Sequence, residues 1–411
     1  MTAPLYNNHQ MPEAKQVTDS DGNKGLWFDR FYDQYDDHNW EVLKPKHNDE
    51  NKGNSYWLTK HFHGKKVGNA DQLKQFSLQQ SNLAKSLGGE SKAFKGNGHF
   101  VTGMGNPHPV ENGLAWHPTL GVPYLTGAAV KGIVRNYIEN YLDDTEENKK
   151  TLLLNWFGST DKDPKKDGYE TQAGNLIFFD AIPLEPVSLV VDIMTPHMGD
   201  WYQNGAKKPG DPKAVPADWH DPTPITFLAA NNISLQFSYA MRQYPTITNS
   251  EYKPEAIDLE DITKVLTSAL KYLGAGGKTA TGYGQFSLDK KAEEDQQAQI
   301  KQQQKEAKKI AELEKAKSTM SKVAGEFFEE SQKHNWETNK DAFLQQGIIE
   351  SWVEKLEESP DKELQEQIEK LMEIHFKGVL ADPEKTKGKK QKPVFKPRIQ
   401  EIAKRLNALR S

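Results

Sequence analysis

An eleven-residue run rich in glycine, 274–284, constrains the fold of this chain more than any other feature. The residues before it place apolar side chains at steps of three and four, as in a helix with one buried face: Ile262, Val265, Leu266, Ala269, Leu270 and Leu273. Gly274 is expected to end that helix, because glycine readily adopts the left-handed conformation that follows a helix C-terminus. Residues 285–288 then alternate in polarity like a strand. The run is therefore predicted to connect a helix to a strand.

The same run has the chemistry of a surface that holds a polyanion. Glycines leave backbone amides accessible, lysine carries a positive charge, threonine hydroxyls donate hydrogen bonds, and tyrosine offers a ring for stacking. The candidate contacts are Gly276, Gly277, Lys278, Thr279, Thr281 and Tyr283. The alternative interpretation is that the glycines only end a helix and turn the chain, although one helix end needs only one glycine.

A nucleotide-binding P-loop is the chemical rival, since residues 277–279 match the end of the pattern G-x-x-x-x-G-K-[ST]. That pattern requires glycine where this chain has Tyr272. It also requires a strand before the loop and a helix after it, whereas the order predicted here is the reverse. The sequence therefore favours contact with a phosphodiester backbone over binding of a nucleotide.

A second candidate phosphate site lies at the start of a helix predicted over residues 127–138. Thr126 is the expected N-cap, and apolar residues form a stripe along the helix. Lys131 and Arg135, four residues apart, share one side of it. The first turn of a helix offers unpaired amides and the positive end of the helix dipole, both of which favour an anion. A solvated polar face is the alternative interpretation of the two basic residues.

Composition limits the classes of function. With 411 residues the chain is long enough for two or three domains. A net charge of -5 and a pI of about 6.2 exclude a general polycation, so a nucleic-acid surface must be a local patch. The absence of cysteine excludes disulfides, zinc fingers and thiol nucleophiles. No window approaches the roughly 20 apolar residues of a membrane span, so we expect a cytoplasmic protein without membrane contact.

The order of the predicted elements favours an α+β fold. Residues 25–32 are dense in aromatic side chains and are expected to form a strand or a docking segment, and 71–87 to form a helix. Residues 96–126 are predicted to be irregular, and 201–224 to be a proline-rich surface loop. Further strands are expected at 175–179, 187–193 and 233–239. This order fits a ferredoxin-like (RRM-like) βαββαβ sheet with its helices on one face.

The composition changes abruptly after Asp289. Residues 290–318 are almost entirely Lys, Glu, Gln and Ala, which predicts a solvated helix. An apolar stripe then returns at Ile310, Leu313, Met320, Val323, Ala324 and Phe327. Helical stretches at 343–356 and 364–376 complete a small bundle. The predicted domains are 1–289 and 290–411.

The last thirty residues are basic, with Glu401 as the only acidic residue between Lys385 and Arg410. Such a tail suits contact with RNA or with an acidic partner. A plain solubilising surface is the alternative, because runs of like charge are commonly solvated.

Twelve histidines raise the question of acid-base catalysis, because histidine titrates near neutral pH. His99, His108 and His117 lie in the predicted irregular stretch, and His61 and His63 form an H-x-H pair. None has the H-x-x-x-H spacing of a zinc enzyme, and no G-x-S-x-G, kinase or carboxylate metal motif occurs. Neither a metal nor another cofactor is expected, and no complete catalytic set is found.

These motifs resemble those of a known family. Residues 121–135 read G-V-P-Y-L-T-G-A-A-V-K-G-I-V-R, which resembles the G-x-P-Y-x-x-G-[SA]-[SA]-x-K-G-x-x-R signature of the RAMP superfamily of CRISPR proteins. Residues 274–284 are similar to the glycine-rich loop of that family. The segment 105–113 and the order of elements are similar to a backbone subunit of the type III-B (Cmr) effector complex. The resemblance covers about residues 20–289.

The resemblance implies a modified ferredoxin-like RAMP domain with a structural role near the 3′ end of a guide RNA, in a ribonucleoprotein that cleaves target RNA in antiviral defence. The implied partners are guide RNA and other Cmr subunits, with target RNA as a further candidate. Cleavage in the family is attributed to another backbone subunit, so the resemblance implies a non-catalytic chain. The contacts it implies are Lys131 and Arg135 in the helix and Lys278, Thr279 and Tyr283 in the loop.

Two other hypotheses remain open at this point. One is a metal-independent RAMP endoribonuclease that processes guide RNA precursor, with His117 or His108 as the base. The other is a protein-binding adaptor in which the helical extension is the working part. The extension over 290–411 is long for the subunit that the chain resembles, and it departs from the family pattern.

Overall fold

The computed structural model describes residues 22–36, 38–39, 41–43, 53–160, 173–205, 210–242, 257–345, 347–387 and 392–410. The chain divides into two compact units, Met1–Ala298 and Gln299–Ser411. The first is a mixed α/β unit with antiparallel sheets, and the second is mainly helical. No helix among the described residues is both long enough and apolar enough to span a membrane.

The first unit contains a central antiparallel sheet whose main strands lie in the order β4-β8-β2-β9. Their bounds are Leu176–Phe178, Ser234–Met241, Glu90–Gly96 and Phe286–Leu288, and β5 (Ile182–Pro183) also pairs with β8. Phe94 of β2 lies opposite Leu235 of β8 and Leu288 of β9, which fixes the register of the three strands. Strand β9 confirms the strand predicted after the glycine-rich run, and β2 was not predicted.

Helices cover both faces of the central sheet. On one face, α5 (Gly127–Asn140) packs against α8 (Leu259–Tyr272), and Thr263 of α8 is hydrogen-bonded to Tyr239 of β8. On the other face, α4 (Ala70–Ser86) contacts the alternate residues of β8, where Gln80 accepts a hydrogen bond from Gln236. The two helices of the predicted βαββαβ order, α5 and α8, share one face, whereas α4 covers the other. Strand β8 is buried on both sides, so alternate side chains need partners in two layers.

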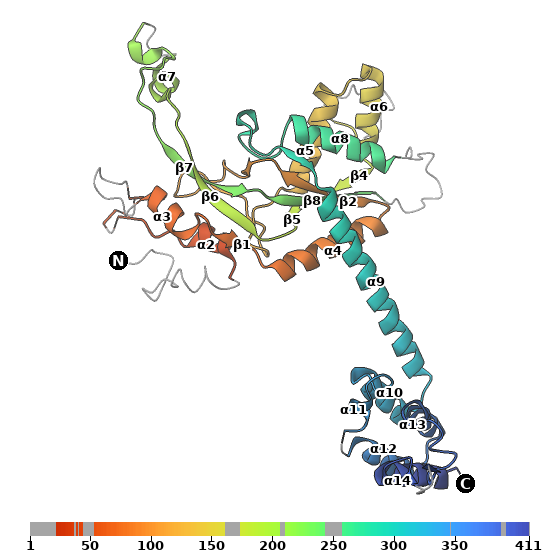
Figure 1. Cartoon of the computed structure of the whole chain (residues 1–411). Coiled ribbons are helices and arrows are strands. Elements are labelled where there is room, and N and C mark those ends of the chain that lie inside the picture. The colour runs from red at the N-terminus through yellow and green to blue at the C-terminus, as the bar shows by residue number, and fades with distance from the viewer. Residues whose placement is uncertain are drawn as a thin grey trace. The chain divides into compact units, whose positions relative to one another are not determined.

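A second antiparallel sheet has the order β1-β6-β7-β3. Its strands are Lys66–Val67, Val187–Met194, Ile225–Asn231 and His99–Phe100. β6 and β7 form a long hairpin whose connection contains α7 (Gly199–Asn204) and the 3₁₀ turn η1 (Pro212–Ala214), so the loop predicted at 201–224 includes two short helical turns (Figure 1). The sequence predicted the strand at 187–193 but not its place in a separate sheet, nor its partner β7.

The aromatic segment at 25–32 forms helix α2 (Lys24–Arg30), so the strand alternative for this segment is wrong. Asn23 caps the helix by accepting a hydrogen bond from Leu26. Phe28 is fully buried and packs against Trp57 of α3 (Asn54–His61) and against Trp116. The aromatic residues recur at helical spacing, so the segment docks through one face of a helix.

Helix α9 (Lys290–Ser318) forms where a solvated helix was predicted, and its first turns pack on the central sheet. Gln296 donates to Gln236 of β8, inside a buried network that also includes Ser81. Ile310 is 57 % exposed, so the apolar stripe does not begin there as predicted.

The second unit is a bundle of helices around its own apolar core. It contains α10 (Lys322–Lys333), α11 (Lys340–Phe343), α12 (Ile348–Glu358), α13 (Lys362–His375), the hairpin β10 (Thr386–Lys387) and β11 (Lys392–Pro393), and α14 (Pro397–Ala408). Trp336, Phe327 and Val353 lie in the core with the apolar side of α14. The helices predicted at 343–356 and 364–376 are confirmed with shifted bounds, whereas α14 was not predicted.

Much of the basic tail is neutralised within this unit. Arg398 and Arg405 of α14 pair with Glu350 and Glu357 of α12. Arg410 pairs with Glu369 of α13. These arginines of the predicted basic tail are therefore compensated by acidic residues of α12 and α13 and do not add to a free basic surface.

Candidate nucleic-acid interface

The glycine-rich loop 274–284 lies against β3, and close backbone contacts hold it there. The Ala275 amide donates to the Gly284 carbonyl (2.7 Å), and the Gly284 amide donates to the His99 carbonyl (2.8 Å). The Gly277 amide donates to the Val101 carbonyl (2.7 Å). A Cβ on Gly276 would lie 2.1 Å from the Val101 oxygen, so the chain approaches too closely for any side chain. Several of the glycines therefore serve the packing of the loop as well as the end of α8.

Several loop amides are already hydrogen-bonded inside the protein. Besides Gly277, the amides of Thr281 and Tyr283 donate to the Lys278 carbonyl, and that of Gly282 donates to the Thr279 carbonyl. The expectation that the glycine run presents bare amides is wrong for these groups. Contact with a phosphate must therefore come mainly from side chains at the loop surface.

Lys278 is the charged residue of the loop, and it is half-buried with its Nζ 4.0 Å from Met194 Sδ. Its backbone is left-handed, with a φ of 57°, which is uncommon for a residue other than glycine. Its Nζ lies 5.4 Å from the ring centroid of Phe227 on β7 and 5.9 Å from that of Tyr283. No ion pair within the described residues involves Lys278. The lysine thus has an aromatic support and an uncompensated charge, a combination suited to a phosphate.

Asp192 of β6 fastens the loop to the second sheet. Its carboxylate accepts a hydrogen bond from the Tyr283 hydroxyl and lies 3.2 Å from Nδ1 of His99. Partial burial opposes ionisation of Asp192, but the hydrogen bonds from Tyr283, Ile193 and His99 hold its pKa below the usual range. Burial and the same carboxylate raise the pKa of Tyr283 to about 12. Tyr283 therefore keeps its proton and holds the loop in place through Asp192.

Asp192→Asn is expected to lower the free energy of unfolding by about 1 kcal/mol at pH 7, since a hydrogen bond to a partly exposed charge becomes a neutral one. Because the pKa of Asp192 is depressed in the folded protein, its contribution is complete above the unfolded value of about 3.9 and is lost as pH falls through the folded value. Urea denaturation of both proteins from pH 7 down to pH 3 measures this. If the two proteins differ in free energy of unfolding by the same amount at pH 7 and at pH 3, the charge of Asp192 is not the source of the difference.

The N-terminus of α5 is already occupied by protein groups. Thr126 is the N-cap, as predicted, and accepts a hydrogen bond from the Ala129 amide (3.2 Å). The Gly127 amide donates to the carboxylate of Asp180 (2.7 Å). The prediction that this helix start offers unpaired amides to a phosphate is therefore wrong for Gly127 and Ala129, and the Asp180 carboxylate already lies at the positive end of the helix.

Lys131 and Arg135 lie on α5 beside α6 (Glu146–Phe157). Lys131 Nζ and the Arg135 guanidinium carbon each lie 5.9 Å from the Phe157 ring centroid, and Arg135 also pairs with Glu139 at 3.0 Å. Phe157 stacks on Phe178 of β4, which is the opposite edge of the central sheet from β9 (Figure 1). Within the described ranges, no hydrogen bond, ion pair or ring contact joins these two residues to the glycine-rich loop. The candidate contacts therefore form two separate groups.

The histidines proposed as bases are held in structural positions. His108 stacks on Phe28 with centroids 4.0 Å apart, and its Nε2 is bonded to the Phe28 carbonyl while its Nδ1 accepts from the Val110 amide. Nδ1 of His117 accepts from the Leu120 amide (3.3 Å). Burial lowers the pKa of both imidazoles. Both nitrogens of His108 are thus engaged, whereas Nε2 of His117, the position that a base would require, has no hydrogen-bond partner among the residues that the structure describes.

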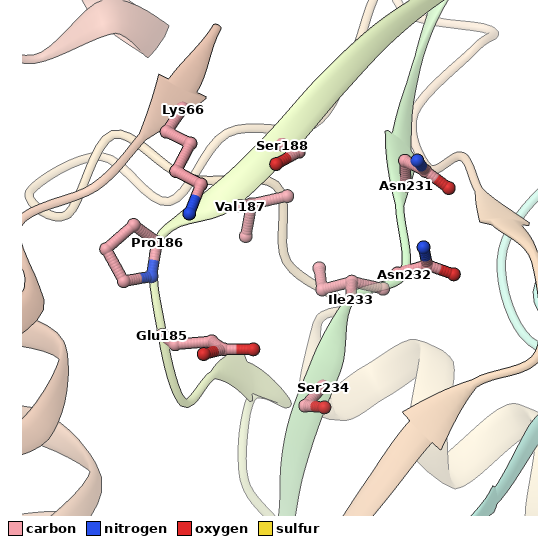
Figure 2. A pocket seen from close by; sticks show the side chains of 9 residues that line it. All are labelled: Lys66, Glu185, Pro186, Val187, Ser188, Asn231, Asn232, Ile233 and Ser234. Carbon is pink, nitrogen blue, oxygen red and sulfur yellow. The ribbon is translucent and has the colours of Figure 1, made fainter. Parts of the chain in front are cut away.

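A cavity of about 220 Å³ lies where the β6–β7 hairpin separates from β8. Figure 2 shows Lys66 and Glu185 on one side and Asn231 and Asn232 on the other. The lining includes one basic residue, Lys66, and one acidic residue, Glu185. None of the predicted contact residues lines the cavity. Sequence reasoning missed this cavity and also missed Asp192, because both depend on strand pairings that have no local signal.

The RAMP superfamily family model matches residues 91–287, a region that begins in β2 and ends in β9. This region of the chain is similar to the RAMP superfamily. The match spans every strand of the central sheet together with α5, α8 and the glycine-rich loop.

Two relatives of this chain are named as subunits of the CRISPR Cmr system. The subunit Cmr6 of Pyrococcus furiosus is 27% identical over 260 residues, which cover 52% of this chain and 72% of the relative. Cmr6 of Saccharolobus solfataricus is 26% identical over 185 residues, 44% of this chain and 50% of the relative, so the match spans half of that protein. A chain in the cryo-EM structure of the Type III-B Cmr-beta bound to cognate target RNA is 19% identical with a TM-score of 0.36, covering 54% of this chain and 66% of that one.

Proposed function

We propose that this chain is a non-catalytic RNA-binding backbone subunit of a type III-B CRISPR (Cmr) ribonucleoprotein complex. In this role it holds the guide RNA near its 3′ end for RNA-guided cleavage of target RNA in the cytoplasm. Lys278 carries the proposal: it is an unpaired cation on a loop that backbone hydrogen bonds and Asp192 hold in place. The names of the two relatives support the complex to which the chain is assigned.

The proposal includes a ferredoxin-like core for the RAMP domain. The central sheet has the strand order β4-β8-β2-β9, and α5 and α8 are the connections that follow β2 and β8. Such a core is a βαββαβ unit in which the two inner strands are the first and third along the chain. Here those inner strands are β2 and β8. The second sheet and α4 are then additions to this core.

The contacts we propose are electrostatic and do not read sequence. Lys278 binds a phosphate, with the Thr279 and Thr281 hydroxyls beside it. Lys131 and Arg135 bind a second stretch of backbone at the other edge of the sheet. Guide RNA is the proposed partner for both groups, with other Cmr subunits, and target RNA is a further candidate.

Lys278→Ala is expected to weaken binding of a fluorescein-labelled oligouridylate to the full chain about tenfold and to lower the salt slope by about 0.7, because one single-strand phosphate contact is lost. Fluorescence anisotropy over a range of salt concentrations measures both quantities. Lys264→Ala is the matched control, since Lys264 is an exposed lysine of α8 already paired with Glu260 at 3.2 Å. Equal binding by the two variants would remove Lys278 from the interface.

The same samples test the endoribonuclease alternative. The oligouridylate and a guide precursor RNA are incubated with the chain in EDTA and resolved by length. We expect intact RNA, because no complete acid-base set surrounds His117 among the described residues. Cleavage that His117→Ala abolishes would establish the enzyme instead.

A further inference from the structure

The hairpin formed by β10 and β11 carries a concentrated positive charge. Residues 385–396 contain six lysines and no acidic residue. Lys385, Lys387, Lys392 and Lys396 are all exposed where the structure describes this segment. The hairpin is fixed by the pairing of β10 with β11 and by the Val394 amide, which donates to the Lys385 carbonyl at 2.8 Å.

The charges of this hairpin face one another instead of acidic partners. Lys387 and Lys392 lie directly opposite each other in the register of the two strands. Like charges in such a cross-strand pair destabilise the pairing. No ion pair in the described part of the chain involves the four exposed lysines. Glu384 lies next to the hairpin, but it pairs with Lys404 of α14. The neighbouring basic residues are thus neutralised, and the hairpin lysines are not.

The two units of the chain also differ in net charge, and the positive one contains the hairpin. Residues 299–411 contain 23 Lys or Arg and 20 Asp or Glu, a net charge of +3, whereas residues 1–298 have a net charge of -8. The four exposed lysines of the described hairpin segment alone exceed the surplus of +3 in the second unit. A local excess of positive charge that attracts a polyanion therefore lies on this hairpin, outside the region that matches the RAMP family.

We propose that the β10–β11 hairpin is a second phosphate-binding surface, which takes the backbone of single-stranded RNA. Lys385 and Lys387 are two residues apart on an extended segment, roughly 6.6 Å, so they can contact successive phosphates. An acidic protein surface fits less well, because specific protein interfaces have an apolar core and the exposed large apolar residue of this segment is Val394 alone. The site binds backbone without reading sequence, and it is independent of the Lys278 loop.

The test compares two full-length variants with the same change in net charge. The hairpin variant carries K385Q, K387Q, K392Q and K396Q. The control removes four lysines of the same unit that are already ion-paired, through K317Q, K362Q, K370Q and K404Q. Binding of labelled oligouridylate is measured by anisotropy against salt concentration. A third variant with arginine at the four hairpin positions keeps the charge and controls for altered structure.

We expect the hairpin variant to bind more than tenfold more weakly and its salt slope to fall by about three, since each single-strand contact contributes about 0.7. The control and the arginine variant are expected to stay near the parent chain. Equal affinity of the hairpin and control variants would overturn the proposal. So would unchanged RNA affinity together with lost binding of a labelled polyglutamate, which would identify an acidic protein surface instead. Neither outcome would alter the result for Lys278→Ala.

Discussion

Gly284→Ala is expected to lower the free energy of unfolding of the first unit by about 3 kcal/mol, the size typical of strain combined with a lost close contact. Gly284 has a φ of 66°, which an L side chain rarely adopts, and a Cβ there would lie 1.9 Å from the Ala275 carbonyl oxygen. The hydrogen bond between Ala275 and Gly284 closes the loop, so the clash acts at its base. Urea denaturation followed by circular dichroism measures the loss.

Gly282→Ala is the matched control for this variant. Gly282 has a φ of 91°, but nothing lies within 4 Å of a Cβ built on it. The control therefore isolates the cost of the left-handed backbone, about 1 kcal/mol. If both variants lose the same stability, the close approach at Gly284 is not what requires glycine there. The loop would then be as tolerant of a side chain as a simple helix end.

The features that could be predicted from the sequence are those that one element sets by itself. The Thr126 cap, the apolar stripe of α5 and the end of α8 at Gly274 follow from residues within a few positions of each other. The change from helix to strand across the glycine-rich run also follows from local periodicity. These predictions are confirmed because the tertiary structure agrees with the conformational preference of each local segment.

The features that could not be predicted depend on register between distant segments. Asp192 meets Tyr283 and His99 only because β6, β7 and β3 pair in one sheet and the loop lies across them. Nothing near Asp192 in the sequence distinguishes it from an ordinary polar residue of a strand. A second sheet was likewise hidden, since β1 and β3 contain two residues each.

Which charges of the basic tail are ion-paired could not be predicted from the sequence either. A count of Lys and Arg treats Arg405 and Lys387 alike, but α14 places Arg405 at 2.7 Å from Glu357 while the hairpin leaves Lys387 opposite Lys392. Net charge along the sequence therefore locates a basic region, and only the fold separates compensated from uncompensated charge. The uncompensated part is the one that can release counterions from a nucleic acid.

Trp336→Ala is expected to lower the free energy of unfolding of the second unit by about 4 kcal/mol, since truncating a buried tryptophan leaves a large cavity. Trp336 is 1 % exposed and lies 5.3 Å from the ring centroid of Phe327 and 6.2 Å from that of Phe343. The two hydrophobic cores share no residue, so we expect the transition of the first unit to keep its midpoint. Differential scanning calorimetry resolves the two transitions.

A variant in the core of the first unit tests the same independence from the other side. Phe286 of β9 is fully buried in the core of the first unit, 6.1 Å from the ring centroid of Phe237, and Phe286→Ala should lower only the transition of that unit. Oligouridylate binding at a temperature between the two midpoints of Trp336→Ala separates the two surfaces, because the unfolded second unit should then lose the hairpin contribution to the salt slope while the first unit keeps that of Lys278. If either variant lowers both transitions by the same amount, the units unfold together. The basic hairpin and the glycine-rich loop would then unfold in one cooperative transition. Loss of RNA binding in either variant could then not be assigned to one of the two surfaces.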